Sequence, residues 1–137
     1  MGKQSSIMNG KTYNFEDRLV KFAGEIIFFC KTLPKDSTGH YYFDQILRSS
    51  GSSALHYGEA QGTNTNKDFI HKMSNVLKEL KETRVSIKIL IHVKYGDEQK
   101  RNYLVKEVGE LIAISAKMIL NKKEQIEQSK SKTQSKQ

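Results

Sequence analysis

Apolar residues recur at alternating steps of three and four along most of the chain, the spacing that gathers them on one face of an α-helix. The first such stretch covers residues 15–33 and stops at Pro34, which cannot continue a helix. Asn14 can cap this helix, and Glu16 and Asp17 in its first turn favour the positive end of the helix dipole. The stripe consists of Phe15, Leu19, Phe22, Ile26, Phe29 and Leu33.

This first helix carries more apolar surface than the core of one bundle requires. Val20, Ile27 and Phe28 lie off the main stripe. A wider apolar arc of this kind indicates a second buried contact. We therefore expect the helix to touch something besides the core of its own bundle.

A second helix is predicted from about His40 to Gln61, after a turn formed by residues 35–39. Its middle, Ser49–Ala54, is rich in serine and glycine, which are poor helix formers in isolation. Because the apolar helical spacing continues on both sides, we interpret this segment as helical, with small side chains where another helix approaches closely. A flexible linker is the alternative. The spaced positions are Phe43, Ile46, Leu47, Ser50, Ala54 and Tyr57.

Two longer helices follow. The third begins after a glycine stop and several N-capping residues at 62–66 and continues to about Lys94, and the fourth runs from about Glu98 to Asn121. Both have amphipathic spacing, which is nearly heptad in the third. Their stripes are Phe69, Met73, Val76, Leu80, Ile87 and Leu90 in the third helix and Leu104, Val108, Leu111, Ser115 and Met118 in the fourth.

Four amphipathic helices joined by short turns predict an all-α fold, an antiparallel up-down four-helix bundle over residues 15–121. One proline, no tryptophan and few turn clusters argue against a β-sandwich or barrel. Residues 1–14 are polar and without periodicity, which predicts a disordered N-terminal arm. Residues 122–137 are rich in glutamine, serine and lysine, so we predict a disordered lysine-rich tail that cannot bury enough apolar area to fold.

The composition shows that the chain is basic and indicates the cellular compartment in which it functions. The net charge is +8, from 23 lysines and arginines against 15 acidic residues, and most of it lies in the two predicted disordered ends. This balance suits nucleic acid or another polyanion, and it suits a merely solvated tail equally well. The single cysteine, Cys30, excludes an intramolecular disulfide and indicates a reducing compartment, which predicts a cytoplasmic location. No apolar run approaches the roughly 18 residues of a membrane-spanning helix.

The sequence contains no motif typical of catalysis or cofactor binding. Walker and dinucleotide-binding patterns are absent, and no serine lies in a Gly-x-Ser-x-Gly elbow. His56 and Glu59 form one His-x-x-Glu pair, whereas a di-metal bundle needs two Glu-x-x-His pairs and two further glutamates. We therefore expect no enzymatic activity, no cofactor and no metal. His56 is interpreted as a partly buried or interface histidine, with metal ligand and catalytic base as the alternatives.

A basic arc on the predicted third helix is the strongest candidate for a functional surface. It occupies about 100° of the helix, opposite the apolar stripe. Such an arc can follow a phosphate backbone, and Lys100, Arg101 and the tail lysines can extend it. Because it has no aromatic residues for stacking on bases, binding would depend on charge and shape; a solvated face without a ligand is the alternative. The arc consists of His71, Lys78, Lys81, Lys88 and His92.

A resemblance to a known family rests on residues 45–62 (QILRSSGSSALHYGEAQG), 68–74 (DFIHKMS) and 77–83 (LKELKET). These segments resemble a bacterial family called four-helix bundle proteins. That family includes proteins encoded in intervening sequences of large-subunit ribosomal RNA genes and the accessory variability proteins of diversity-generating retroelements. The likeness covers about residues 15–121. It implies a ring-like homopentamer without catalytic activity, and its retroelement members bind nucleic acid and a reverse transcriptase through basic surfaces.

The family pattern can be carried over position by position as a set of packing and polar contacts. His56 departs from it, because an asparagine is usual there, and Asn66 stands where a basic residue often precedes the Asp-Phe pair. The modest charge of the bundle also argues against a reverse-transcriptase accessory role, which would favour a more basic surface. The matching residues are Arg48, Ser50, Gly51, Glu59, Gln61, Phe69 and Glu82.

Three hypotheses for function follow. The first is a homo-oligomeric interaction protein that binds structured RNA or single-stranded nucleic acid non-specifically through Lys78, Lys81, Lys88 and the tail. The second is a structural scaffold for a protein partner, such as a reverse transcriptase, which would use the extra apolar face of the first helix and bind no nucleic acid. The third is a metalloenzyme built on His56 and Glu59.

Overall fold

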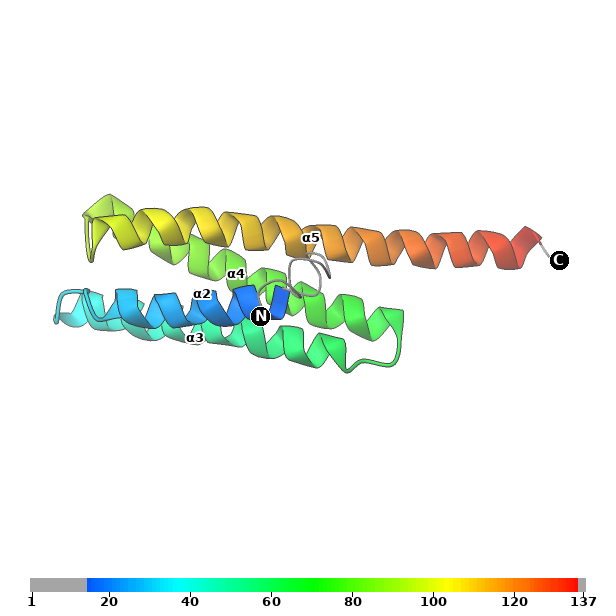
Figure 1. Cartoon of the computed structure of the whole chain (residues 1–137), viewed down its shortest axis with the longest axis horizontal. Helices are drawn as coiled ribbons and strands as arrows, with labels where there is room; N and C mark the ends of the chain where they lie inside the picture. Colours follow the sequence, from blue (N-terminus) through cyan, green and yellow to red (C-terminus); the bar gives the residue numbers. More distant parts are fainter. Residues whose placement is uncertain (1–14, 136–137) are drawn as a thin grey trace, which may run out of the picture.

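Residues 15–135 of the chain form four α-helices, shown in Figure 1. The computed structural model describes residues 15–135, and the predicted N-terminal arm, residues 1–14, lies outside them. Each helix packs on the next one along the chain, and the first also packs on the last, so the helices close into an up-down bundle. The predicted four-helix architecture is confirmed. The helices are α2 (Phe15–Cys30), α3 (Ser37–Gln61), α4 (Asn66–Val93) and α5 (Glu98–Ser135).

Side-chain caps explain where α3 and α4 begin. The carboxylate of Asp36 accepts a hydrogen bond from the backbone N–H of Gly39 at 2.7 Å, so α3 starts at Ser37, earlier than the predicted His40. The hydroxyl of Thr65 accepts one from the N–H of Asp68 at 3.0 Å and caps α4 in the same way. In each case the side chain of the residue just before the helix accepts a hydrogen bond from a backbone N–H of the first turn, which has no acceptor within the helix.

The core contains the predicted apolar stripes. Phe15 and Tyr57 meet edge to face with ring centroids 4.9 Å apart. Cys30 donates a long hydrogen bond to the carbonyl oxygen of Phe43. These two contacts lie at opposite ends of α2 and fix its antiparallel register with α3. Burial raises the pKa of the Cys30 thiol to about 12, so this thiol is unreactive. Within residues 15–135, no helix has the length and apolar content to cross a membrane.

The end of α5 corrects the prediction of a disordered tail. The helix does not stop at Asn121 but continues to Ser135, and Figure 1 shows it extending past the other helices. Residues 122–135 contain no glycine or proline and are mostly lysine, glutamate and glutamine, which favour helix once one is nucleated. Lys122 also lies 4.9 Å from the ring centroid of Phe69 on α4. The prediction of disorder rested on the low apolar content of this segment. Residues 123–133 are exposed, except for Ile126, but they are helical.

Candidate functional site at the α3–α4 contact

The serine-rich middle of α3 is helical and buried against α4, as the sequence predicts. The hydroxyl oxygens of Ser49 and Thr83 lie 2.6 Å apart, and Thr83 donates to the carbonyl oxygen of Glu79 at 2.9 Å, so Ser49 is the donor of the shared bond. Ser53 donates to the carbonyl oxygen of Ser50 at 2.7 Å. Small hydroxyl side chains thus let the two helices approach while every hydroxyl hydrogen has an acceptor.

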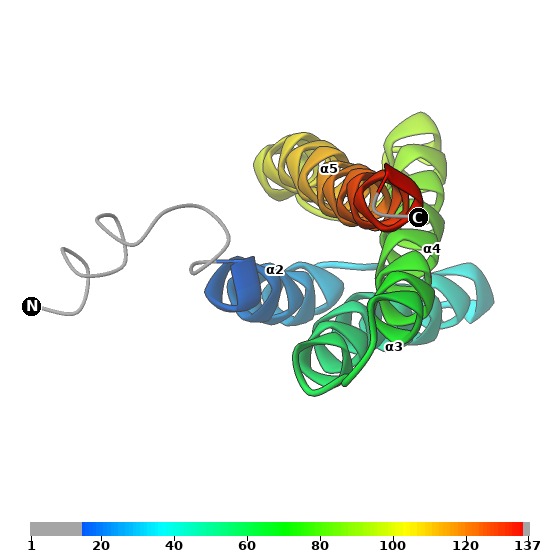
Figure 2. The same cartoon turned by 90° about the vertical axis from the view of Figure 1, so that its right-hand side faces the viewer.

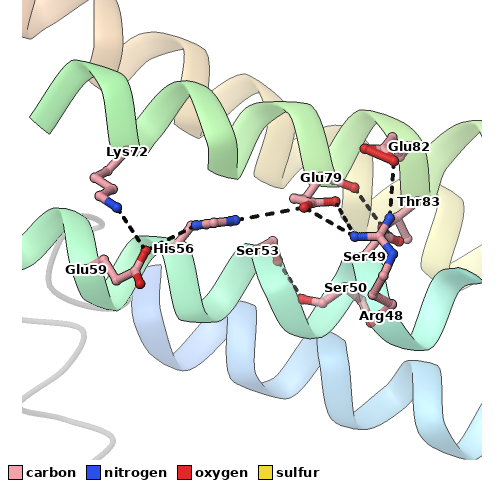
Figure 3. A network of polar contacts seen from close by, with 10 residues as sticks. All are labelled: Arg48, Ser49, Ser50, Ser53, His56, Glu59, Lys72, Glu79, Glu82 and Thr83. Carbon is pink, nitrogen blue, oxygen red and sulfur yellow. Dashed lines mark hydrogen bonds and ion pairs between the residues drawn. The ribbon is translucent and has the colours of Figure 1, made fainter. Parts of the chain in front are cut away.

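Ion pairs border this buried layer (Figure 3). Arg48 on α3 places one guanidinium nitrogen 3.2 Å from Glu79 and the other 3.2 Å from Glu82, both on α4. Its side chain is about half exposed, so the pairs contribute modestly to stability. Their main effect is to hold two α4 carboxylates on the side of α4 that faces α3.

His56 continues the network towards the end of α3. Its Nδ1 lies 3.2 Å from Glu59, and its Nε2 lies 3.8 Å from Glu79, so each ring nitrogen faces a carboxylate. Lys72 on α4 also pairs with Glu59, at 3.4 Å. The hydrogen bond with His56, followed by the contact with Lys72, lowers the pKa of the Glu59 carboxyl below its usual value. In this structure His56 is an interface histidine between two helices.

The network is held by ion pairs and hydrogen bonds. Its serine hydroxyls are buried and donate to the backbone or to Thr83. Across residues 15–135, no three histidine, cysteine or carboxylate side chains are grouped so that they could hold a metal ion. His56 and Glu59 have each other, Glu79 and Lys72 as partners, and within residues 15–135 these side chains are not arranged to hold a metal ion.

The residues matching the family pattern are only partly brought together. Arg48, Glu82 and Glu59 belong to the network, and buried Ser50 lies beside it. Gln61 is separate and donates to the hydroxyl oxygen of Tyr57 at 3.0 Å. Phe69 is separate too and carries Lys122 over its ring. Gly51 faces outward: a Cβ built on it meets no atom within 4 Å.

The predicted basic arc lies on the outer side of α4. Lys78, Lys81 and Lys88 are exposed, and none of them has an ion-pair partner among residues 15–135. Lys78 and Lys81 border an open groove of about 610 Å³. The groove also contains Leu77 and Val85, of which Val85 is 55% exposed. Sequence reasoning missed this apolar floor, although the step from 77 to 81 to 85 indicates one face.

The other two basic residues assigned to this surface behave differently. Lys100 is exposed at the start of α5, in a separate shallow groove with Lys21 and Tyr103. Arg101 is buried, with 6% of its surface exposed, which leaves little of its side chain for the predicted contact with nucleic acid.

Arg101 is buried because it closes the α4–α5 turn. One of its guanidinium nitrogens donates to the carbonyl oxygens of Tyr95 and Gly96, at 2.8 and 2.9 Å. Gly96 has a φ of +80°, and a Cβ there would collide with the Phe29 ring. The step from Arg101 to Leu104 and Val108 in the sequence places the arginine on the core face of the helix.

Comparison with known proteins agrees with this fold. A family model described as "23S rRNA-intervening sequence protein" matches residues 12–117. The chain belongs to this family. It is also similar to the crystal structure of a protein of unknown function from the S23 ribosomal protein family of Bacteroides thetaiotaomicron. That similarity has 27% sequence identity and a TM-score of 0.71 and covers 77% of this chain and 97% of the other. A search among curated proteins finds no match.

Membership in the 23S rRNA-intervening sequence protein family confirms the resemblance on which the sequence analysis relied. The matched region includes α2, α3 and α4 completely and the first half of α5. The whole α3–α4 contact and the α4 lysines therefore lie inside the region that defines the family.

Proposed function

We propose that this protein is a non-enzymatic helical bundle that binds RNA non-specifically through Lys78, Lys81 and Lys88, the outer lysine face of α4. One observation carries the proposal: Arg48 pairs with the acidic residues Glu79 and Glu82 of the same helix from the α3 side. The three lysines are exposed and unpaired among residues 15–135, and Glu82 borders the same groove as Lys78 and Lys81. Arg48 partly offsets the charge of these two acids from the α3 side, and the lysines keep their charge for an external anion.

The spacing of these lysines fits a phosphate backbone. At a rise of about 1.5 Å per residue, Lys78 and Lys81 stand about 4.5 Å apart along α4, and Lys88 follows after about 10.5 Å. Neutralising phosphates releases counterions, which gives affinity without base recognition. The names of the matched family and of the structural relative's family both refer to the ribosome or its RNA, which makes RNA the first ligand to test.

Self-assembly is part of the same proposal. The resemblance implies a ring-like homopentamer, and helical glycines such as Gly51, where a Cβ would meet no atom of residues 15–135, support close contact with another copy. With one buried cysteine the protein suits a reducing cytoplasm.

A scaffold for a protein partner, such as a reverse transcriptase, is the second candidate. The apolar floor of the α4 groove favours it, because RNA has no use for the exposed Val85 side chain. In that case the lysines would flank an apolar contact with an acidic partner.

The two functions can be separated by charge reversal. We expect the triple variant Lys78→Glu, Lys81→Glu and Lys88→Glu to lose at least about tenfold in affinity for a structured RNA, measured by filter binding at low salt. The matched control reverses Lys106, Lys117 and Lys123, which are exposed on α5, and so has the same net charge. Equal affinity of the two triple variants would refute RNA binding by α4. No retention of RNA by the unaltered protein would favour the scaffold.

A further inference from the structure

α2 presents an apolar face that no described element covers. The helix packs on α3 and α5, and its buried residues face them, while the opposite side points away from the bundle (Figure 2). On that opposite side Val20 and Phe28 are 58% and 56% exposed. Gly24 lies between them, and a Cβ built on it meets no atom within 4 Å. Apolar residues gathered in this way mark an interaction surface.

Five residues on this side of α2 are arranged symmetrically about Gly24. Asp17, Val20, Gly24, Phe28 and Lys31 follow one another at steps of three, four, four and three. These steps keep all five on one side of the helix. Reading outward from Gly24, each direction meets a large apolar residue and then a charge, and the two charges have opposite sign.

We propose that this face joins two copies of the chain, with α2 of one packed antiparallel on α2 of the other about a twofold axis at Gly24. This arrangement sets Val20 against Phe28 and Asp17 against Lys31, and the symmetry makes each contact twice. Parallel packing would instead oppose Asp17 to Asp17 and Lys31 to Lys31. The charges therefore select both the partner and its direction.

The state of the five residues in the single chain supports this contact. Asp17 and Lys31 are exposed and have no ion-pair partner among residues 15–135; Lys31 lies 5.7 Å from the ring centroid of Phe28. Glycine inside a helix costs about 1 kcal/mol relative to alanine, and among residues 15–135 no contact at Gly24 compensates for this. A glycine at this position lets the backbone of a second helix approach closely, because it has no side chain in the way.

This contact is distinct from a ring and does not depend on RNA binding. A twofold contact uses the same surface on both copies and closes after two, whereas a ring needs two different surfaces. If the chain also forms rings through other faces, the α2 contact joins them in pairs. The α4 lysines are on a different helix, so a failure here leaves the proposed function untouched, and the converse also holds.

A cysteine on the axis gives the most direct test, because only a residue on a twofold axis meets its own copy. We expect Gly24→Cys, in a Cys30→Ala background, to form a disulfide-linked dimer on mild oxidation at micromolar concentration. Gly109→Cys is the control, since that glycine on α5 also has open space around it. No cross-linking at position 24, or equal cross-linking at both positions, would overturn the proposal.

Charge exchange tests the direction of packing. We expect Asp17→Lys and Lys31→Glu each to weaken association at least about tenfold, which light scattering records as loss of half the assembly mass at a fixed concentration. The double variant restores opposite charges and should return to within about threefold of the original. Lys117→Glu, an exposed change on α5, should leave the mass unchanged. Failure of the double variant to restore association would assign the face to a different partner.

Discussion

Among single residues, a few buried polar groups determine local structure more than the exposed charges do. Arg101 shows this most clearly: it belongs to a basic pair in the sequence, yet it is buried and bonded to the backbone of the α4–α5 turn. Its neighbour Lys100 is exposed. Their charge alone suggests that the two residues act together, whereas their positions on α5 put Arg101 on the core face and Lys100 on the exposed face. The periodicity that predicted the core also contained this information for Arg101.

Replacing Arg101 should therefore destabilise the bundle. We expect Arg101→Met to lower the free energy of unfolding by about 2–3 kcal/mol, because two backbone carbonyl oxygens lose a charged donor. Lys100→Met, next to it and exposed, should change this free energy by less than about 0.5 kcal/mol. Urea denaturation measures both. Equal effects would contradict the role of Arg101 in the turn.

Two carboxylates predict how stability depends on pH. His56 and Lys72 lower the pKa of Glu59, and the Gly39 N–H and the Tyr95 hydroxyl, which donates at 3.1 Å, lower that of Asp36. A pKa that is lower in the folded state adds stability above the unfolded-state pKa, and this stability is lost as pH falls through the folded-state pKa. We expect the denaturation midpoint to fall on acidification below about pH 4.5.

Neutral variants show whether these two carboxylates are responsible. Glu59→Gln combined with Asp36→Asn should flatten the acid limb of the stability profile. Glu124→Gln, a single exposed carboxylate outside the network, should leave the acid limb as it was. An unchanged acid limb in the double variant would show that the loss of stability arises elsewhere.

Among the elements, α3 shows how far local sequence predicts structure. Its serine-rich segment was predicted as helix because apolar spacing continued around it, and Ser49, Ser50 and Ser53 are helical and buried. The polar partners could not be predicted, because pairing Arg48 with Glu79 and Glu82 depends on the register of two helices. α5 shows the reverse case: low apolar content predicted a disordered tail, but exposed residues without apolar burial can still continue a helix.

Substitutions in α3 should differ in sign according to which side they face. Ser53→Leu adds bulk to a closely packed contact and should destabilise by about 1–3 kcal/mol. Gly51→Ala adds a Cβ where no atom lies within 4 Å and should raise the stability of the isolated chain by about 0.5–1 kcal/mol. Thermal unfolding at a concentration too low for association measures both. A stabilising Ser53→Leu would contradict the close α3–α4 contact.

The extension of α5 should contribute helix but little stability. A chain that ends at Asn121 loses the helical residues 122–135 and the contact of Lys122 with Phe69. We expect a smaller far-ultraviolet circular dichroism signal and a loss of about 1 kcal/mol in unfolding free energy. An undiminished signal per molecule would contradict a helix that continues to Ser135.

At the scale of the whole molecule, ion pairs between helices determine which charged side chains remain unpaired on the surface. The net charge of +8 says little by itself. The arrangement matters: Arg48 pairs with Glu79 and Glu82 of α4, and Lys78, Lys81 and Lys88 remain unpaired within residues 15–135. The sequence predicted the arc of lysines, while the paired acids and the apolar groove beside the lysines required the structure.

The salt dependence of RNA binding tests the α4 lysine face most directly. Binding of a structured RNA is measured over a series of salt concentrations, for the unaltered protein and for the variant with Lys78, Lys81 and Lys88 changed to glutamine. We expect the slope of log affinity against log salt to be shallower by about 2 in the variant, because three phosphate contacts are lost. Identical slopes would contradict the assignment of RNA binding to α4.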